Sequence, residues 1–367
     1  MAKILVIDDS AELLEMIRLL LERRGGHQAI LSADGTDGLA QARADPPDLA
    51  IIDVMMPDIS GYEVCRQLRA NPSTASIPII ILTARGQLVD RQAALGAGAD
   101  EYMAKPVMMM ELLERVNDLL AERVMRELPT FAGTVVLLSL RGGVGVTTLA
   151  VNLAATLAQV GEGTTCLVDL CPSSGHMALQ LGLRPEPNWS GLVQAGALDA
   201  DVIEAHLLQH ASGLRVLASP VFPVIEHGLS QAITQTTLSI LQERHTVTIV
   251  DAPPVLDEAM MVALETATVV GLVITAERFS IQTAVGTLRV LKQWSAKFQI
   301  ILNQITPEPQ LSSGAIERAL RYPPVWTIPY DPAQVEASAQ GIPLALHAPS
   351  SPLAQAVQGL VQHLASS

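Results

Sequence analysis

A chain of 367 residues is long enough for two or three domains, each with its own hydrophobic core. Apolar residues make up 49% of the chain and charged residues 16%, a composition that excludes intrinsic disorder. The 23 Lys and Arg against 37 Asp and Glu give a net charge of -14, and no segment clusters five or more basic residues. This charge pattern argues against nucleic acid as a partner and weakens the case for anionic lipid.

Neither a membrane span nor a disulfide framework is expected. No stretch of 18 residues forms an unbroken apolar run, and the first apolar run, Ile4–Ile7, is too short for a secretory signal. The three cysteines, Cys65, Cys166 and Cys171, lack CxxC spacing, which predicts reduced thiols rather than disulfides or a zinc site. We therefore expect a cytoplasmic protein without a transmembrane segment.

The first 124 residues alternate short apolar runs with helical periodicity. Strands are expected over residues 4–7, 27–31, 49–52, 78–82 and 100–103, and helices over 11–24, 37–43, 62–69, 88–95 and 109–124. Continuous apolar strands separated by amphipathic helices predict an α/β fold with a five-stranded, doubly wound parallel sheet. Ligands of such sheets gather at the carboxyl ends of the strands.

Chemically active residues stand at those carboxyl ends. Asp8 and Asp9 follow the first strand, Asp53 ends the third, Thr83 follows the fourth and Lys105 follows the fifth. Three carboxylates at one edge are tolerated where oxygen ligands hold a hard cation such as Mg²⁺. Asp53 could then attack a phosphoryl donor, with Lys105 and Thr83 contacting oxygens of the product. Taken without the other residues, the two adjacent aspartates are equally typical of a helix N-cap.

The segments LVIDDS, IIDVMMPDISGYE, ILTA and DEYMAKP resemble response-regulator receiver domains, over about residues 1–124. The resemblance implies that Asp53 is the phosphoacceptor and that a histidine kinase is a partner. It also implies that Asp9 and Asp53 bind Mg²⁺ directly, that Asp8 acts through water, and that the backbone of Met55 is a further ligand.

The same resemblance implies two local features of the last strand of this region. Tyr102 would be the aromatic that turns inward on activation, although an aromatic on an edge strand is also common as simple packing. The peptide between Lys105 and Pro106 would be cis. A phosphoryl group adds a charge of about -1.5 to -2, enough to reorder Thr83 and the loops beside it.

A second, larger α/β region follows a short boundary. Pro129, Thr130 and Gly133 separate the last helix from a new apolar run, so we expect domains at residues 1–126 and 134–367 with a linker over 127–133. Further strands are expected over residues 135–140, 164–168, 214–218, 247–250, 268–274, 298–302 and 325–328. The alternation predicts a second doubly wound, mainly parallel sheet.

The first strand of this region runs into a glycine-rich loop and then a helical pattern. The loop reads Arg141, Gly142, Gly143, Val144, Gly145, Val146, Thr147 and Thr148. Glycines let backbone N–H groups point into a concavity, and a helix N-terminus adds partial positive charge, which together suit a polyphosphate. The hydroxyl of Thr147 is placed for Mg²⁺, and Asp251 ends a later strand where it could hold the same ion through water. Three glycines alone are also typical of an ordinary tight turn.

The segments SLRGGVGVTTLAVNLA, VDLCPSSG, VTIVDAPP, ILNQ and TIPYD resemble the ParA/MinD superfamily of deviant phosphate-loop ATPases, over about residues 134–364. The resemblance implies a homodimer, ATP with Mg²⁺ as cofactors, Asp169 in the nucleotide site and Asn303 near the adenine. With LQLGLRP, SGLRVLASP and the receiver at the N-terminus, the chain is most similar to the CpaE/TadZ group, which is associated with the assembly and placement of Tad-type pili. Pilus-assembly components, and recruitment to a pole or to the inner face of the membrane, would follow.

The chain departs from the superfamily pattern at three positions. Val146 stands where the pattern has the lysine for the β and γ phosphates, Arg141 replaces the signature lysine that reaches across the dimer, and Cys171 replaces the second carboxylate after Asp169. One lost transition-state contact costs about 10² to 10³ in rate, so two losses predict negligible turnover. The backbone amides, Thr147 and Arg141 would still bind ATP. Without a His or cationic neighbour in sequence, Cys171 is expected to be an inert replacement.

Three functions remain open at this point. The leading hypothesis is a scaffold protein regulated by phosphorylation, whose ATPase-like domain dimerises without efficient hydrolysis. The alternative is an active ATPase that positions cargo, with Arg141 replacing the missing lysine. A DNA-binding regulator fits the receiver, but no basic output domain follows it. The C-terminal apolar stripe, residues 353–364, contains no Lys or Arg and is expected to pack on its domain rather than on a membrane.

Overall fold

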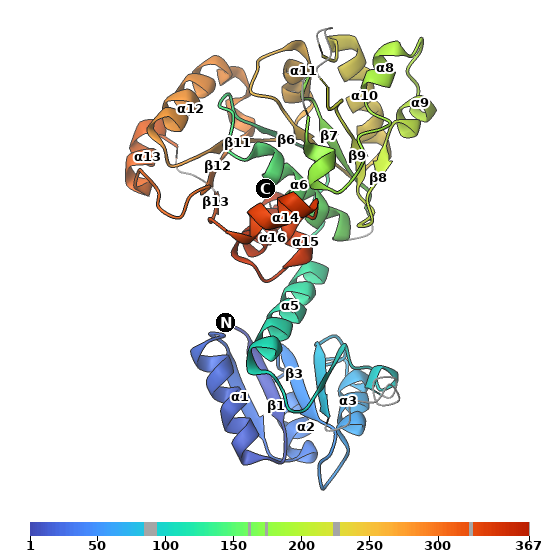
Figure 1. The fold of residues 1–367 in the computed structure, drawn as a ribbon, viewed down its shortest axis with the longest axis vertical. Helices are drawn as coiled ribbons and strands as arrows, with labels where there is room; N and C mark the ends of the chain where they lie inside the picture. The colour runs from blue at the N-terminus through green and yellow to red at the C-terminus, as the bar shows by residue number, and fades with distance from the viewer. Residues whose placement is uncertain (84–93, 161–162, 173–174, 223–227, 323–325, 367) are drawn as a thin grey trace. The chain divides into compact units, whose positions relative to one another are not determined.

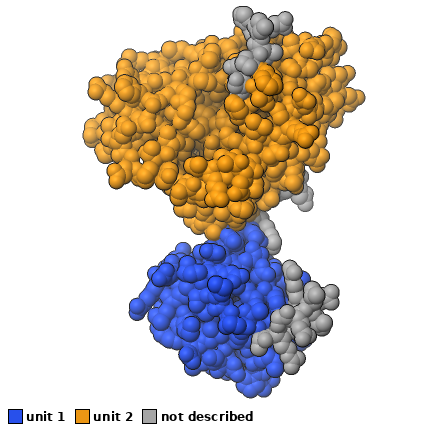
Figure 2. Space-filling model, in the orientation of Figure 1, with its two compact units in different colours: residues 1–124 blue, residues 125–367 orange. Residues whose placement is uncertain are grey.

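The computed structural model describes residues 1–83, 94–160, 163–172, 175–222, 228–322 and 326–366. The chain divides into two compact units, Met1–Val124 and Met125–Ser367, which Figure 2 draws in different colours. Among the described residues, no helix has the length and apolar character needed to cross a bilayer.

The first unit is a five-stranded parallel sheet with helices on both faces (Figure 1). Its strands, in the spatial order β2-β1-β3-β4-β5, are β1 (Lys3–Ile7), β2 (Gln28–Ser32), β3 (Leu49–Asp53), β4 (Ile79–Thr83) and β5 (Glu101–Ala104). Its helices are α1 (Ala11–Arg23), α2 (Gly35–Ala44), α3 (Gly61–Ala70) and α5 (Met109–Glu127). The predicted five-stranded fold is confirmed, while most of the helix expected over residues 88–95 falls outside the described residues.

Alternating side chains of the strands build two cores. Ile4 and Val6 of β1 pack on one face among residues of α1 and α5, while Leu5 and Ile7 pack on the other face among residues of α2 and α3. A strand buried on both faces reads as a continuous apolar run, which is the pattern in the sequence. Ser10 begins α1 as its N-cap, because its hydroxyl accepts a hydrogen bond from the Leu13 N–H.

The second unit is built on an eight-stranded sheet. The spatial order is β13-β12-β11-β6-β10-β7-β9-β8, and the strands are β6 (Gly133–Leu138), β7 (Thr165–Asp169), β8 (Leu208–Gln209), β9 (Arg215–Leu217), β10 (Val247–Asp251), β11 (Val269–Ile274), β12 (Phe298–Asn303) and β13 (Trp326–Ile328). All neighbours pair in parallel except β8 with β9. The mainly parallel sheet is as predicted, whereas β8 is an edge strand that the sequence pattern did not indicate. The start of the last expected strand, residue 325, lies outside the described residues.

The helices of this unit differ in length. They are α6 (Val146–Gln159), α7 (Met177–Gln180), α8 (Ser190–Gln194), α9 (Ala200–Ala205), α10 (Gln231–Arg244), α11 (Glu258–Thr266), α12 (Arg278–Val290), the 3₁₀ helix η1 (Lys292–Lys297), α13 (Ser313–Leu320), α14 (Ala333–Gln340), α15 (Leu344–His347) and α16 (Pro352–Ser366). The apolar stripe of α16 is buried against α6 and β13, as expected for packing on the domain.

The segment expected as a linker contributes to a core. Leu128 and Phe131 are buried in the same apolar cluster as Met125, Val135 and Leu157 of the second unit. These two side chains are therefore part of the core of that unit.

Candidate phosphorylation and nucleotide sites

Three carboxylates meet at the carboxyl edge of the first sheet. Asp8, Asp9 and Asp53 each offer an oxygen, and these three oxygens lie within 4.8 Å of one another. Asp8 and Asp53 are buried, while Asp9 is exposed. Oxygen donors at this spacing match the ligands that Mg²⁺ prefers, so the residues present fit the predicted ion.

Lys105 bridges the two buried carboxylates. Its Nζ atom lies 2.7 Å from Oδ2 of Asp8 and 2.7 Å from Oδ1 of Asp53. Burial raises the pKa of the Asp53 carboxyl above its ordinary value, although the hydrogen bond from Lys105 opposes the change. Burial lowers the pKa of Lys105, but its hydrogen bonds to Asp53 and Asp8 outweigh burial and the pKa is raised. A second cation would relieve the remaining negative charge at this edge.

The other residues predicted for this site lie at the same edge. The N–H of Met55 donates to Oδ2 of Asp53 at 3.1 Å, so the predicted phosphoacceptor has a partner on each oxygen. Thr83 is buried at the end of β4, and its carbonyl accepts a hydrogen bond from the Lys105 N–H. Tyr102 is partly buried on β5 against one of the two cores. The peptide before Pro106 is cis, as the resemblance implied.

The glycine loop joins β6 to α6 in the second unit. Gly143 and Gly145 have φ angles of 79° and 86°, a backbone region that glycine adopts without steric cost. Nδ2 of Asn303, at the end of β12, donates to the carbonyl of Val144 at 2.8 Å. A Cβ atom on Gly145 would lie 2.4 Å from the same Nδ2. Asn303 therefore supports the loop, a contact that the sequence did not indicate, and its proximity to adenine stays a prediction.

A cavity of about 240 Å³ opens above the loop. Residues 141–148 line it together with Ser139, Cys171 and residues 251–254. The Thr147 hydroxyl donates a hydrogen bond to the Asp251 carboxylate. Burial and the neighbouring Asp169 raise the pKa of Asp251 well above its ordinary value, and the bond from Thr147 opposes them. The hydroxyl oxygen of Thr147 and the buried carboxylate of Asp251 are oxygen ligands of the kind that Mg²⁺ prefers, so both residues fit the predicted ion.

Asp169 ends β7 beside this cavity as a fully enclosed carboxyl. Its Oδ1 accepts the Cys171 N–H at 2.9 Å and its Oδ2 accepts the Ser219 hydroxyl at 2.8 Å. Burial raises the pKa of Asp169 to about 6. The side chain is thus held by donors of its own unit, and contact with a nucleotide stays a prediction.

Arg141 is the one charged residue of the glycine loop, residues 141–148. Val146 is partly buried against the core and brings no charge to the cavity. A guanidinium nitrogen of Arg141 lies 2.6 Å from a carboxylate oxygen of Glu277, the residue before α12. Glu277 was not among the predicted site residues. Glu277 follows β11 at the carboxyl edge of the sheet, and this position in the sequence could have indicated that it lies near the loop.

Comparison with known proteins identifies the first unit. Residues 4–117 match the family model of the response regulator receiver domain. Protein PilH of Pseudomonas aeruginosa is 38% identical over 121 residues, which cover 33% of this chain and 99% of that protein. The chain belongs to the response-regulator receiver family. Response regulator MprA of Mycobacterium avium is 43% identical over 118 residues, and there the match covers 50% of the relative.

The second unit is similar to other proteins in fold. Residues 132–304 match the family model of the AAA domain. The crystal structure of a ParA family ATPase from Chlorobium tepidum superimposes with a TM-score of 0.59 at 22% identity, covering 64% of this chain and 99% of that one. The structure of the septum site-determining protein MinD from Pyrococcus horikoshii, complexed with Mg-ADP, superimposes with a TM-score of 0.56 at 21% identity. The match covers 63% of this chain and 95% of that one. This receiver domain is therefore fused to an AAA domain with a ParA/MinD-like fold.

Proposed function

We propose that this protein is a phosphorylation-regulated scaffold whose receiver domain, residues 1–126, controls a ParA/MinD-like domain, residues 134–367. A histidine kinase would phosphorylate Asp53, and the second domain would bind ATP and dimerise with little hydrolysis. One contrast carries the proposal: Lys105 contacts Asp53 in the first site, whereas Val146 leaves the phosphate loop of the second without its usual lysine.

The receiver residues have defined roles in this proposal. A Mg²⁺ ion held by Asp8, Asp9 and Asp53 would screen the carboxylates from an incoming phosphoryl group. An oxygen of Asp53 attacks the phosphorus, the bond between phosphorus and the histidine nitrogen of the kinase breaks, and Lys105 pairs with an oxygen of the transferred group. Since Lys105 contacts both Asp8 and Asp53 beforehand, the new charge of about -1.5 to -2 redistributes its ion pairs. Thr83, at the end of β4, and Tyr102, on β5, would change conformation in response.

The nucleotide domain would hold ATP through the backbone of its loop. Residues 142–145 and the start of α6 offer N–H groups, while Thr147 and Asp251 would hold Mg²⁺. Arg141 is engaged by Glu277, so it supplies a phosphate contact only when that ion pair opens. Positively charged contacts to the β and γ phosphates are therefore scarce, which supports binding over turnover.

The biological setting rests on sequence resemblance. The segments shared with the CpaE/TadZ group support a role in Tad-type pilus assembly, with pilus-assembly components as partners of a homodimer. Such a scaffold would act in the cytoplasm and be recruited to a pole or to the inner face of the membrane.

The test of this proposal is a cellular one with two variants. Asp53→Ala removes the phosphoacceptor, and Gly145→Ala places a Cβ atom against Asn303 and distorts the phosphate loop. We expect loss of pili or of focal localisation in both strains at normal protein levels. Wild-type assembly and localisation in both strains would reject the proposal.

A second function, an active ATPase that positions cargo, is favoured by one observation. Arg141 is a cation on the loop itself, and its side chain is about one-third exposed, so it can leave Glu277 and enter the cavity. Turnover at saturating Mg-ATP that Arg141→Ala abolishes would establish this function. No turnover would exclude it.

A further inference from the structure

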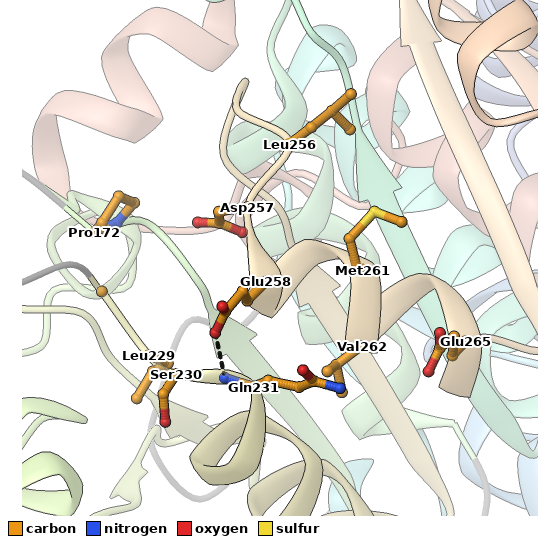
Figure 3. A pocket seen from close by; sticks show the side chains of 11 residues that line it. Pro172, Leu229, Ser230, Gln231, Leu256, Asp257, Glu258, Met261, Val262 and Glu265 are labelled. Carbon is orange, nitrogen blue, oxygen red and sulfur yellow. Dashed lines mark hydrogen bonds between the residues drawn. The ribbon is translucent and has the colours of Figure 1, made fainter.

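The second unit contains a groove beyond the proposed nucleotide site. Its volume is about 810 Å³, and the start of α10 and one side of α11 supply most of its wall (Figure 3). That volume falls in the range of sites that take a ligand or the anchoring side chains of a peptide. Leu229 and Val262 are buried at its base, while Met261 is partly exposed and Leu256 is 39% exposed. The groove therefore has an apolar floor open to solvent.

Three carboxylates surround this floor. Asp257 caps α11, with Oδ1 accepting the Met260 N–H at 2.9 Å. Glu258 contacts the start of α10, with Oε2 accepting the Gln231 N–H at 3.1 Å, as the dashed line in Figure 3 shows. These bonds use one oxygen of each carboxylate. Glu265 is exposed in the last turn of α11.

The negative charge of these three carboxylates is not neutralised by the other groove-lining residues that the structure describes. None of the described lining residues is basic. Lys297 lies near the end of α11, but its Nζ donates to the carbonyls of Leu264 and Glu265, where it caps the helix. A bound segment with Lys or Arg beside apolar side chains would complement both the apolar floor and the carboxylates around it.

We propose that this groove is the docking site for a basic amphipathic segment of a partner protein. Apolar side chains of the segment would contact Leu229, Leu256 and Met261, and its Lys or Arg would pair with Glu258 and Glu265. A second copy of this chain is a poorer occupant, because the chain carries a net charge of -14. Charge complementarity thus selects a basic heterologous segment.

Two loops connect the groove with the nucleotide cavity. Cys171 lines the cavity and the next residue, Pro172, lines the groove. Likewise, residues 251–254 line the cavity, and Leu256 and Asp257 line the groove. A shift of either loop on nucleotide binding would reshape the groove, so the docked segment would sense the nucleotide. This coupling rests on the nucleotide binding proposed above, whereas docking itself does not.

The test uses the full chain and a synthetic amphipathic helical peptide of Leu and Lys, with binding followed by fluorescence anisotropy at physiological ionic strength. The double variant E258Q/E265Q removes two charges, yet the new amide at position 258 keeps a carbonyl oxygen that can accept the Gln231 N–H. The matched control, E317Q/E336Q, removes two exposed charges from α13 and α14. We expect at least about a fivefold loss of affinity in the groove variant and less than about a twofold loss in the control.

A third variant tests the apolar floor. Met261→Ser should weaken the peptide several-fold without changing the net charge, because its side chain lines the groove. Thermal unfolding of each variant checks that the fold is retained. Equal losses in both charge variants, or an unchanged affinity in Met261→Ser, would overturn the proposal. It would also fail if the chain self-associates and groove substitutions abolish that association.

The coupling has its own readout. Peptide affinity measured with and without Mg-ATP should differ at least about twofold if the connecting loops transmit the nucleotide state. Identical affinities in protein that has bound ATP would overturn the coupling. Because docking is first measured without nucleotide, failure of ATP binding is distinguishable from failure of docking.

Discussion

The two sites place cations differently around buried acids. In the receiver, Lys105 lies 2.7 Å from both Asp8 and Asp53, so the charge of the cluster is partly balanced before any ligand arrives. In the ParA/MinD-like domain, Asp169 and Asp251 are buried together, Val146 brings no charge, and Arg141 pairs with Glu277. The comparison teaches that two parallel sheets can both gather buried acids at the carboxyl edge and differ in whether a nearby cation contacts those acids or pairs with another residue.

The largest expected effect concerns the receiver site. Asp53→Ala should abolish incorporation of phosphate from a small phosphodonor such as acetyl phosphate, because it removes the attacking oxygen. Intact-mass measurement checks this loss of phosphate incorporation. Asp9→Asn should reduce the amount of phosphate incorporated, and Asp53 should remain the phosphorylated residue. Undiminished phosphorylation of the Asp53→Ala protein would show that another residue is the acceptor.

The next effect comes from adding a cation to the glycine loop. Val146→Lys should tighten ATP binding by roughly ten- to a hundredfold, since a charged hydrogen bond contributes about 1.5 to 3 kcal/mol. Val146→Met is the matched control, because it lengthens the side chain without adding charge. Equilibrium titration with a fluorescent ATP analogue measures both. Equal affinities in the two variants would mean that position 146 does not face the phosphates.

Stability should depend on pH through the buried acids of the second site. Burial raises the pKa of Asp169 to about 6, so the folded state retains a proton that the unfolded chain releases near pH 4. Without Mg²⁺, Asp169 should therefore lower the free energy of unfolding by about 2 kcal/mol as pH rises from about 4.5 to about 6.5, and the raised pKa of Asp251 should add to this fall.

Tryptophan fluorescence isolates this effect, because Trp189, Trp294 and Trp326 all belong to the second unit. Urea unfolding followed by this signal measures the slope against pH. Asp169→Asn should reduce the slope, and an unchanged slope in that variant would assign the effect to other groups.

The smallest effect separates two glycines of one loop. Gly145→Ala should weaken ATP binding by about tenfold, because φ is 86° and the new Cβ would meet Asn303 at 2.4 Å. Gly142→Ala is the control, since nothing lies within 4 Å of its added Cβ. Calorimetric titration compares the two. Similar losses for both would indicate that the backbone at position 145 is not specially constrained.

Strand ends were the most informative feature of the sequence. Because parallel strands share a carboxyl edge, Asp8, Asp53 and Lys105 could be brought together from the pattern alone. The same reasoning placed Thr147 near Asp251. Short runs of four to seven residues indicated most strands of both sheets, since strands buried on two faces show no alternation, but the edge strand β8 was not indicated.

The contacts that were missed depend on side-chain packing. Asn303 contacts the loop carbonyl of Val144 across 159 positions, and Glu277 contacts Arg141 from the segment after β11, the strand that pairs with β6. Neither has a local spacing signature. The burial of Leu128 and Phe131 was also hidden, because Pro129 and Thr130 between them are typical of an exposed connection.

The most direct measurement of the central claim is a paired assay on one sample of purified protein. ATP that remains bound after desalting in Mg²⁺ is quantified, and released phosphate is followed over hours in the same sample. Our account predicts retained ATP with no release above that of an Asp251→Ala control. Steady release that depends on Arg141 would contradict it and would make the domain a working ATPase.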